Sequence, residues 1–328
     1  MIRCSVIIPA YNAGKTISAC LGALADQSLP AHDYEVIVVD DGSEDGTGAL
    51  ARQYPVRYFH QANRGPAAAR NHGSREASGP VILFTDADCV PSPTWIEEMI
   101  KPLADPAVSA VKGAYLTNQR SLFARFAQVE FEERFELLKR AASIDMVDTY
   151  SAAYRADVFR AAGGFDESFP VANNEDTELS YKLSRMGHTM VFNPRAVVYH
   201  LNHPDSLARY SRLKFWRGYW RMVVYRRYPD KMMKDSYTPQ TLKLQVLFLF
   251  MLAGWLFGMP LWPAYLVYPF GATLLLYGAS VMPFAVLAFR RDVAVALLSP
   301  FFLSIRAASL GSGFLWGILR RERGRTKA

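Results

Sequence analysis

The chain of 328 residues is 51% hydrophobic and 20% charged, with 37 Lys+Arg against 30 Asp+Glu and a formal net charge of +7. This length suits one large or two ordinary domains, and the composition excludes a disordered, collagen-like or disulfide-stapled chain. The charge is uneven, because residues 1–208 hold 19 Lys+Arg and 26 Asp+Glu (net −7), whereas residues 209–328 hold 18 and 4 (net +14). The mildly basic average therefore describes neither half.

The first half alternates short apolar runs with segments of helical pattern. The runs predict strands at SVIIP (5–9), EVIVVD (35–40), VRYF (56–59) and PVILFTD (80–86), and the intervening patterns predict helices at 15–26, 45–53, 66–77 and 94–103. Continuous apolar strands separated by helices indicate a parallel sheet covered on both faces, which is a doubly wound α/β domain. Ligands of such domains bind at the carboxyl ends of the strands, so we expect the binding and catalytic residues there.

The pattern loosens beyond residue 112. We expect an amphipathic helix at about 122–142 whose Phe stripe packs into a core, and a second helix from the cluster Asn173-Asn174-Glu175-Asp176 to Met186, ended by Gly187. Two short strands, 189–193 and 196–199, are predicted to follow and to end at His200.

Residues 209–234 carry nine Lys+Arg, one Asp and seven aromatic residues. A basic helix rich in Trp and Tyr that leads into an apolar segment is typical of a helix lying on an anionic leaflet. A nucleic-acid-binding helix is the alternative. We favour the membrane and expect no nucleic-acid partner, because the following segment supplies a membrane beside this helix.

Residues 244–289 contain no Asp, Glu, Lys or Arg. This stretch is long enough for two transmembrane helices, predicted at about 242–258 and 264–289, with Met259-Pro260-Leu261-Trp262-Pro263 as an interfacial turn. Basic residues precede the first helix and follow the second, while the turn has none, so the positive-inside rule predicts a hairpin entered from the cytosolic side.

A third apolar stretch, 293–319, is long enough to cross but contains Pro300 and Arg306. Crossing would also place the basic C-terminal residues outside. We therefore expect this segment to lie in the interface or to re-enter, with Arg306 meeting a lipid phosphate or, more simply, snorkelling to headgroups.

Three scattered cysteines without a CxxC pair argue against a zinc site and a disulfide framework, and they fit a reducing compartment. The first residues run directly into the first predicted strand, and their apolar stretch is too short for a signal peptide. We accordingly expect the amino-terminal domain to be cytosolic.

Two segments resemble phosphate-binding motifs, but the spacing of their glycines does not match those motifs. Gly14-Lys15-Thr16 resembles the end of a Walker loop, but Pro9 stands where that loop needs its first Gly. The glycines at 42, 46 and 48 do not have the GxGxxG spacing and follow the second predicted strand instead of the first. A P-loop is excluded, and the glycine motif that would indicate nicotinamide binding is absent from these residues.

Asp86-Ala87-Asp88 follows the fourth predicted strand and brings two carboxylates together on an abrupt turn. Alternate residues of an extended segment can direct oxygens at a hard divalent cation such as Mg²⁺ or Mn²⁺. Two solvated turn residues are the simpler interpretation. The neighbouring strand ends favour a ligand site, because they also carry polar groups.

Six segments together resemble family 2 glycosyltransferases of the GT-A fold, which use nucleotide-sugar donors. The matching text is SVIIPAYNAG (5–14), YEVIVVDDGSEDGT (34–47), NRGPAAARNHG (63–73), VILFTDADCVP (81–91), AAGGFDESF (161–169) and NNEDTELSYKL (173–183). The resemblance covers roughly residues 4–200 and implies a mostly parallel, Rossmann-like catalytic domain.

The resemblance implies a donor site. Pro9, Tyr11 and Asp41 would hold the base and ribose of the nucleotide, which agrees with the ability of a Tyr ring to stack and of a carboxylate to accept an N–H. Arg70 would contact the diphosphate, its alternative being a surface ion pair. Within Asp86-Ala87-Asp88, Asp86 would bind the donor ribose or sugar and Asp88 the metal.

The same resemblance implies a catalytic base and a further metal ligand. Asp176 would deprotonate the acceptor hydroxyl in a single in-line, inverting displacement; the simpler interpretation is a charge that complements the helix dipole. His200 would join Asp86 and Asp88 as a ligand of Mg²⁺ or Mn²⁺, and its neutral imidazole suits Mn²⁺ better. The alternative is an ordinary histidine hydrogen-bonded to a loop.

These features predict a cytosolic catalytic domain at 1–205, a basic aromatic interfacial helix at 206–240 and a membrane region at 241–328. The expected function is transfer of a single sugar from a nucleotide-diphosphate sugar to a lipid-linked or membrane-proximal hydroxyl acceptor of a cell-envelope glycan, at the cytosolic face of the inner membrane. Processive polymerisation is disfavoured, because the Gln-x-x-Arg-Trp motif of processive family members is lacking near Lys214-Phe215-Trp216-Arg217. The alternatives are a polyisoprenyl-phosphate sugar synthase, which needs no base, and a non-catalytic nucleotide-binding membrane scaffold.

Overall fold

Two units make up the chain in the computed structural model, which describes residues 2–169, 173–261 and 263–320. The first unit comprises Met1–Gln119, Phe135–His203 and Asp235–Tyr237, and the second comprises Arg120–Arg134, Pro204–Lys234 and Thr238–Ala328. The predicted turn residue Trp262 and the basic residues beyond Arg320 lie outside the described residues.

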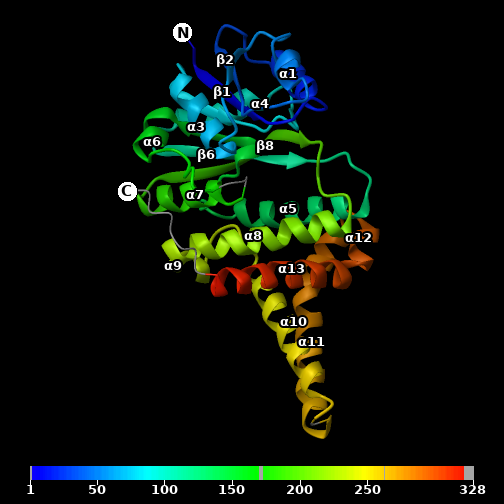
Figure 1. The fold of residues 1–328 in the computed structure, drawn as a ribbon. Coiled ribbons are helices and arrows are strands. Elements are labelled where there is room, and N and C mark those ends of the chain that lie inside the picture. Colours follow the sequence, from blue (N-terminus) through cyan, green and yellow to red (C-terminus); the bar gives the residue numbers. More distant parts are fainter. Residues whose placement is uncertain (1, 170–172, 262, 321–328) are drawn as a thin grey trace. The chain divides into compact units, whose positions relative to one another are not determined.

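The first unit is built on an eight-stranded sheet in the order β3-β2-β1-β4-β7-β6-β8-β5. Strands β1, β2, β6 and β8 are labelled in Figure 1. The strands are β1 (Cys4–Ala10), β2 (Tyr34–Asp40), β3 (Arg57–His60), β4 (Val81–Phe84), β5 (Cys89–Pro91), β6 (Val108–Leu116), β7 (Ala152–Arg155) and β8 (Thr189–His200). The first four strands pair in parallel, as predicted. The pairs β4–β7, β6–β7 and β5–β8 are antiparallel, so the sheet is mixed and the predicted α/β class is confirmed.

Helices follow most strands of the first unit. They are α1 (Ile17–Ala25), α2 (Thr47–Ala51), α3 (Pro66–Glu76), α4 (Trp95–Ile100), α6 (Ala156–Ala161) and α7 (Glu175–Arg185), with 3-10 turns at Lys101–Ala104 and Thr149–Ser151. Helix α3 begins with Pro66 after Gly65, whose φ of 91° favours glycine. After α7, Gly187 has a φ of 86° and donates its N–H to the carbonyl of Ser184, which closes the last turn as the sequence predicts.

The interior of this unit consists of consecutive buried residues on the central strands. Residues 6–8 of β1 and 37–39 of β2 are fully buried, as expected for strands covered on both faces. Helix α3 packs closely on them, because a Cβ added at Gly73 would collide with the side chains of Ile7 and Val39. This close approach holds α3 against β1 and β2, and the hydrogen bond from the N–H of Gly65 to Asp41 joins the start of α3 to the carboxyl end of β2.

Three features of the first unit differ from the sequence-based expectation. The predicted strands 189–193 and 196–199 form one strand, β8, whose pairing with β6 shifts register around Asn193-Pro194. The strands β5, β6 and β7 were not predicted, since β6 and β7 lie in segments without the alternating pattern and β5 has only three residues. The helix expected to reach residue 142 ends at Leu138.

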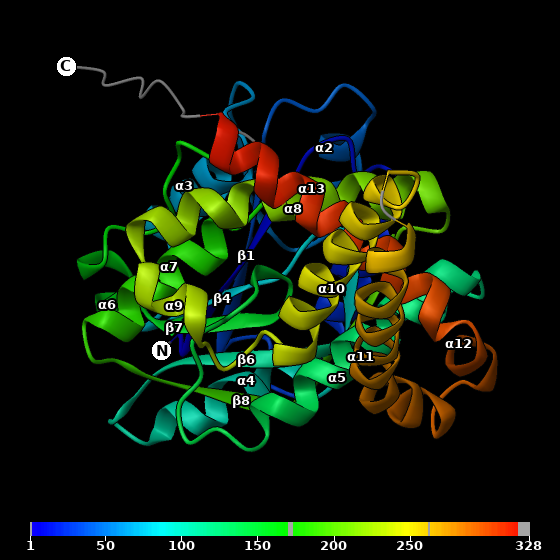
Figure 2. The same ribbon diagram turned by 90° about the horizontal axis from the view of Figure 1, so that it is seen from below.

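The second unit is helical. It contains most of α5 (Leu122–Leu138), then α8 (Leu207–Arg227), α9 (Pro229–Met233), α10 (Gln240–Gly258), α11 (Pro263–Phe289), α12 (Val293–Leu297) and α13 (Ser299–Leu319). Helices α10 and α11 lie side by side as a hairpin, and α13 runs along α8 (Figures 1 and 2). Among the described residues, three helical segments are long and apolar enough to cross a membrane, namely 240–258, 264–289 and 299–319.

An apolar cluster and a group of buried charges hold this unit together. Phe126 of α5 stacks on Phe302 of α13 with ring centroids 4.6 Å apart. Glu130 of α5 is fully buried, and its carboxylate accepts from Lys214 Nζ of α8 at 2.9 Å and from Arg306 Nη1 of α13 at 3.4 Å. Arg306 therefore points into the helical unit, which differs from the expectation that it meets lipid phosphates or snorkels to headgroups.

Candidate active site

The loops that follow β1 and β2 are joined by hydrogen bonds. The N–H of Asn12 donates to Ser43 Oγ at 2.9 Å, and Asn12 Oδ1 accepts from the N–H of Glu44 at 2.9 Å. Tyr11 lies at the start of this double loop with 55% of its surface exposed, and Pro9 is half-buried in the strand before it. An exposed Tyr ring on a rigid loop at a strand end is suited to stacking on a planar base.

Asp41 is 3% exposed and ties the end of β2 to the start of α3. Its Oδ1 accepts from Gln61 Nε2 at 2.7 Å and from the N–H of Arg64 at 2.9 Å, and its Oδ2 accepts from the N–H of Gly65 at 2.8 Å. A carboxylate offers about four lone-pair sites, so these bonds leave acceptor capacity on Asp41 for a base N–H. The structure thus shows a structural role for Asp41 at the end of β2, and its contact with the base stays a prediction.

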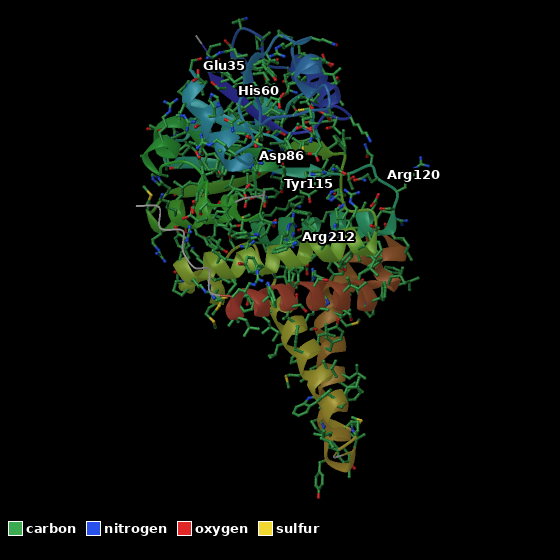
Figure 3. All side chains as sticks on the ribbon, in the orientation of Figure 1. Glu35, His60, Asp86, Tyr115, Arg120 and Arg212 are labelled. Carbon is green, nitrogen blue, oxygen red and sulfur yellow. The ribbon has the colours of Figure 1, made fainter. Side chains whose placement is uncertain are left out.

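Asp86, labelled in Figure 3, begins the turn Asp86-Ala87-Asp88 between β4 and β5. The carbonyl of Asp86 accepts from the N–H of Cys89 at 3.0 Å. The two carboxylate side chains are 28% and 27% exposed, so both remain accessible. Burial raises the pKa of Asp88, and His200 opposes this rise. The turn therefore presents two carboxylates at the edge of the sheet where ligands of α/β domains bind.

His200 ends β8, which pairs with β5, and this pairing brings the imidazole to Asp88. His200 Nε2 lies 3.7 Å from Asp88 Oδ1, and ligand atoms of Asp88, Cys89 and His200 all lie within 4.8 Å of one another. Burial and the nearby acidic residues raise the pKa of the Cys89 thiol well above its usual value, which disfavours the thiolate as a ligand. An imidazole beside a carboxylate is a donor set that fits Mn²⁺.

Arg70 of α3 is 2% exposed and makes two ion pairs. Its Nη2 donates to Asp86 Oδ1 at 2.7 Å and its Nη1 donates to Glu175 Oε1 at 2.9 Å. The arginine expected to contact the diphosphate thus joins the turn after β4 to the first residue of α7.

Asp176 lies in the first turn of α7 and is half-buried, whereas the preceding Glu175 is buried. The Oδ1 of Asp176 accepts from the N–H of Thr177 at 2.7 Å. Burial raises the pKa of Glu175 to about 7; Asp176 adds to this rise and Arg70 opposes it. Asp176 is therefore the more accessible carboxylate of the pair.

The structure joins some predicted site residues directly and leaves others apart. An ion pair links Arg70 to Asp86, and His200 lies beside Asp88, while Tyr11 and Asp41 lie on the neighbouring strand ends. Sequence reasoning did not assign a role to Glu175, although the residue stands in the acidic cluster that we singled out. Only its burial and its contact with Arg70 distinguish Glu175 from an ordinary surface acid.

Comparisons with known proteins find glycosyltransferases that resemble this chain. Residues 5–163 match the family model described as Glycosyl transferase family 2. The glycosyltransferase AglE of Haloferax volcanii is 28% identical over 220 residues, covering 65% of this chain and 72% of the relative. The validoxylamine A glucosyltransferase of Streptomyces hygroscopicus is 31% identical over 57% of this chain, and the match spans only about half of that protein (52%).

A solved structure has the same fold over nearly the whole chain. It is the mannosyltransferase PcManGT from Pyrobaculum calidifontis in complex with GDP-Man and Mn²⁺, with a TM-score of 0.62, 21% identity and coverage of 98% of this chain and 88% of the other. At that identity the likeness concerns the fold alone. Together with the mixed sheet, the likeness shows the GT-A fold. Within this fold, residues 5–163 match the sequence pattern of glycosyltransferase family 2.

Proposed function

We propose that this protein is a membrane-anchored, metal-dependent inverting glycosyltransferase, which transfers a single sugar from a nucleotide-diphosphate sugar to a lipid-linked or membrane-proximal hydroxyl of a cell-envelope glycan. The observation that carries the proposal is the bridge by which Arg70 joins Asp86, in the expected donor turn, to Glu175, the neighbour of the expected base. The expected donor turn and the expected base are thus connected through Arg70 within a single site.

The donor side consists of the strand ends. Tyr11 would stack on the base, Asp41 would accept from it, and Asp86 would contact the ribose or sugar. Asp88 and His200, with Asp86 nearby, would hold Mg²⁺ or Mn²⁺. A divalent cation bound there supplies positive charge that stabilises the departing diphosphate.

Asp176 would act on the acceptor side as the base. The acceptor oxygen forms a bond to the anomeric carbon while the bond from that carbon to the diphosphate breaks, and the hydroxyl proton passes to the Asp176 carboxylate. The products are the glycosylated acceptor and the nucleoside diphosphate. The Asp176 carboxylate is half-buried in the first turn of α7, so it is accessible to an acceptor hydroxyl.

The anchor would be the α10–α11 hairpin. These helices expose large apolar side chains along their length, including Phe257 and Leu275, and such surfaces are covered by lipid in a membrane protein. Basic residues flank the hairpin at Lys243 and at Arg290 and Arg291, so the positive-inside rule favours an entry and an exit at the cytosolic face of the inner membrane.

Helix α13 would lie along the membrane surface and not cross it. Its backbone packs directly on α8, since a Cβ added at Gly218 would collide with the carbonyl of Leu310, and one added at Gly313 with that of Phe215. Farther along, Arg226 Nη2 donates to the carbonyl of Gly317 at 2.7 Å. Because α8 carries seven Lys+Arg and cannot reside in hydrocarbon, a helix packed along it shares its depth.

Labelling of single cysteines tests this topology in intact cells. The native Cys4, Cys20 and Cys89 are buried, so a membrane-impermeant maleimide should react only with the introduced cysteine. We expect Leu261→Cys, at the end of the hairpin, to be labelled from outside and Arg320→Cys, after α13, to be protected until the cells are opened. Labelling of Arg320→Cys in intact cells would overturn the surface position of α13.

Turnover of nucleotide sugars tests the activity. The full chain in detergent should release a nucleoside diphosphate from at least one of a panel of UDP-, GDP- and TDP-sugars, and EDTA should abolish this release. An extract of membrane lipids should accelerate it. Absence of turnover with every donor and extract would favour the non-catalytic scaffold, and full turnover by Asp176→Asn would favour an acceptor that is already ionised, as in a polyisoprenyl-phosphate sugar synthase.

A further inference from the structure

Arg70 is a buried cation that uses both ends of its guanidinium group. The side chain is 2% exposed, and Nη2 and Nη1 donate to Asp86 and Glu175 at 2.7 and 2.9 Å. The two carboxylates come from different elements, one from the turn after β4 and one from the first residue of α7. A planar guanidinium with fixed donor directions holds two such partners at a defined separation.

Glu175 extends this link to the start of α7. Its Oε1 accepts from Arg70, while its Oε2 accepts from the N–H of Asn173 at 2.7 Å. Asn174, which lies between Asn173 and Glu175, has a left-handed backbone with φ of 70°, and this conformation needs support from its surroundings. Glu175 therefore fastens the turn from which Asp176 projects.

Direct binding of a diphosphate by Arg70 conflicts with this arrangement. The guanidinium group would have to leave one or both carboxylates, and Glu175 would then be left buried without its cationic partner. Removing one partner from a buried ion pair is strongly unfavourable. The side chain also lies beneath the site surface, whereas Asp86 is the accessible member of the bridge.

We propose that Arg70 and Glu175 are positioning residues that fix the catalytic base Asp176 relative to the donor-binding residue Asp86. Asp86 thereby holds one end of a chain of contacts whose other end is the first turn of α7. This inference rests on the proposed function, because it takes Asp176 as the base and Asp86 as a donor contact. It assigns Arg70 a role distinct from binding the phosphates.

The test compares Arg70→Lys with a matched variant on the same helix, Arg75→Lys, whose side chain is exposed at the far end of α3. A lysine keeps the charge but provides a point-like ammonium group, which does not reproduce the two fixed donor directions. We expect Arg70→Lys to lower kcat by about 10²-fold, the scale of a small misplacement of reacting groups. Its KM for the donor should change less than threefold, and Arg75→Lys should match the parent protein.

Two binding and exchange measurements separate positioning from phosphate contact. UDP and GDP, each with Mn²⁺, and the corresponding monophosphates are titrated into the full chain, and amide hydrogen exchange is followed at residues 173–177. Positioning predicts unchanged nucleotide affinities and faster exchange in Arg70→Lys. A tenfold loss of diphosphate affinity with unchanged monophosphate affinity and exchange would overturn the proposal.

Glu175→Gln keeps the inference testable if Arg70→Lys folds poorly, because the amide is nearly isosteric and alters only the base side. It should also speed exchange at residues 173–177 and lower kcat while diphosphate binding is retained. Normal exchange with normal kcat would contradict the proposal. If Asp176→Asn keeps full turnover, the assigned base is wrong, yet the exchange result still reports whether Arg70 and Glu175 hold the start of α7.

Discussion

The two units contain buried ion clusters of opposite sign. In the first unit a cation, Arg70, lies between the carboxylates of Asp86 and Glu175, with Asp176 beside them. In the second unit a carboxylate, Glu130, lies among cations that include Lys214 and Arg306. One cluster has an excess of negative charge and the other an excess of positive charge around its centre.

The two clusters also differ in exposure. Glu130, Lys214 and Arg306 have side chains that are at most 2% exposed, and Tyr210 donates a further hydrogen bond to Glu130 at 2.9 Å. In contrast, 28% of the Asp86 side chain is exposed. The closed cluster is inaccessible to a ligand, whereas the open one has negative charge accessible to a cation or a donor. This difference distinguishes a site from a structural ion network.

The largest effect on the open cluster should come from Asp176→Asn. Loss of a general base typically lowers turnover by about 10²- to 10⁴-fold, while the donor nucleotide should still bind because the strand ends are untouched. Product formation from the donor found in the panel measures the loss. Asp157→Asn, at the exposed start of α6, serves as the control. A parent-like rate in Asp176→Asn would show that Asp176 is not the general base.

The largest effect on the closed cluster should come from Glu130→Ala, which leaves Lys214 and Arg306 buried without their shared partner. We expect the free energy of unfolding to fall by about 3–5 kcal/mol. Denaturant unfolding of the full chain in detergent measures this change. Removing Glu136, which pairs with Lys139 on the surface at 2.8 Å, should cost less than about 1 kcal/mol. Equal losses in the two variants would show that burial of the cluster does not matter.

Loss of the imidazole beside Asp88 should weaken metal binding. Even an outer partner of a metal site contributes about 10- to 100-fold in affinity, so we expect His200→Gln to lower Mn²⁺ affinity by at least that factor. Calorimetric titration with Mn²⁺ checks this effect. His188→Gln provides the control, since His188 Nδ1 lies 3.0 Å from Ser109 Oγ, outside the candidate site. Unchanged Mn²⁺ affinity in His200→Gln would identify His200 as an ordinary strand-end histidine.

Acidification should lower the free energy of unfolding through the closed cluster, by less than Glu130→Ala does. Burial raises the pKa of Glu130, but Lys214, Arg306 and Arg134 lower it, to about 2 against 4.5 in the unfolded chain. A lowered folded-state pKa gives stability that is present above pH 4.5 and lost as the pH falls toward 2. Lys214, whose pKa burial lowers to about 7, is protonated in both states below pH 6 and adds no slope there.

Unfolding measured from pH 6 to pH 3.5 should therefore show a loss of about 1 kcal/mol that depends on Glu130. Glu130→Gln should begin less stable and lack this component. An identical pH dependence in the two proteins would contradict the assignment of this titration to Glu130.

Much of the fold could be predicted because its signals are local. The apolar runs of β1 to β4, Pro66 at the start of α3 and Gly187 after α7 each act within a few residues of the sequence. The charge-free stretch from residue 244 to 289 likewise predicts its helices from composition alone. The strands β5 to β7 were missed, because their identity depends on pairing with distant strands and not on their own pattern.

The candidate site was predicted as a set of residues but not as a network. The turn Asp86-Ala87-Asp88 and the helix start at Asp176 were recognisable from the sequence. The contact between Arg70 and Glu175 joins residues 105 positions apart, and that between Glu130 and Arg306 joins residues 176 apart. No periodicity or motif carries such pairings.

Propensity, hydropathy and turn chemistry are local, so they predict which strands begin the sheet, where an apolar hairpin lies and which residue types stand at the strand ends. Tertiary contacts are what bury Arg70 between two carboxylates and pack α13 along the basic α8 instead of leaving it alone as a third apolar segment. The physical reason is that burial depends on neighbours brought together from distant parts of the chain. The same arginine or apolar helix has a different role once those neighbours surround it.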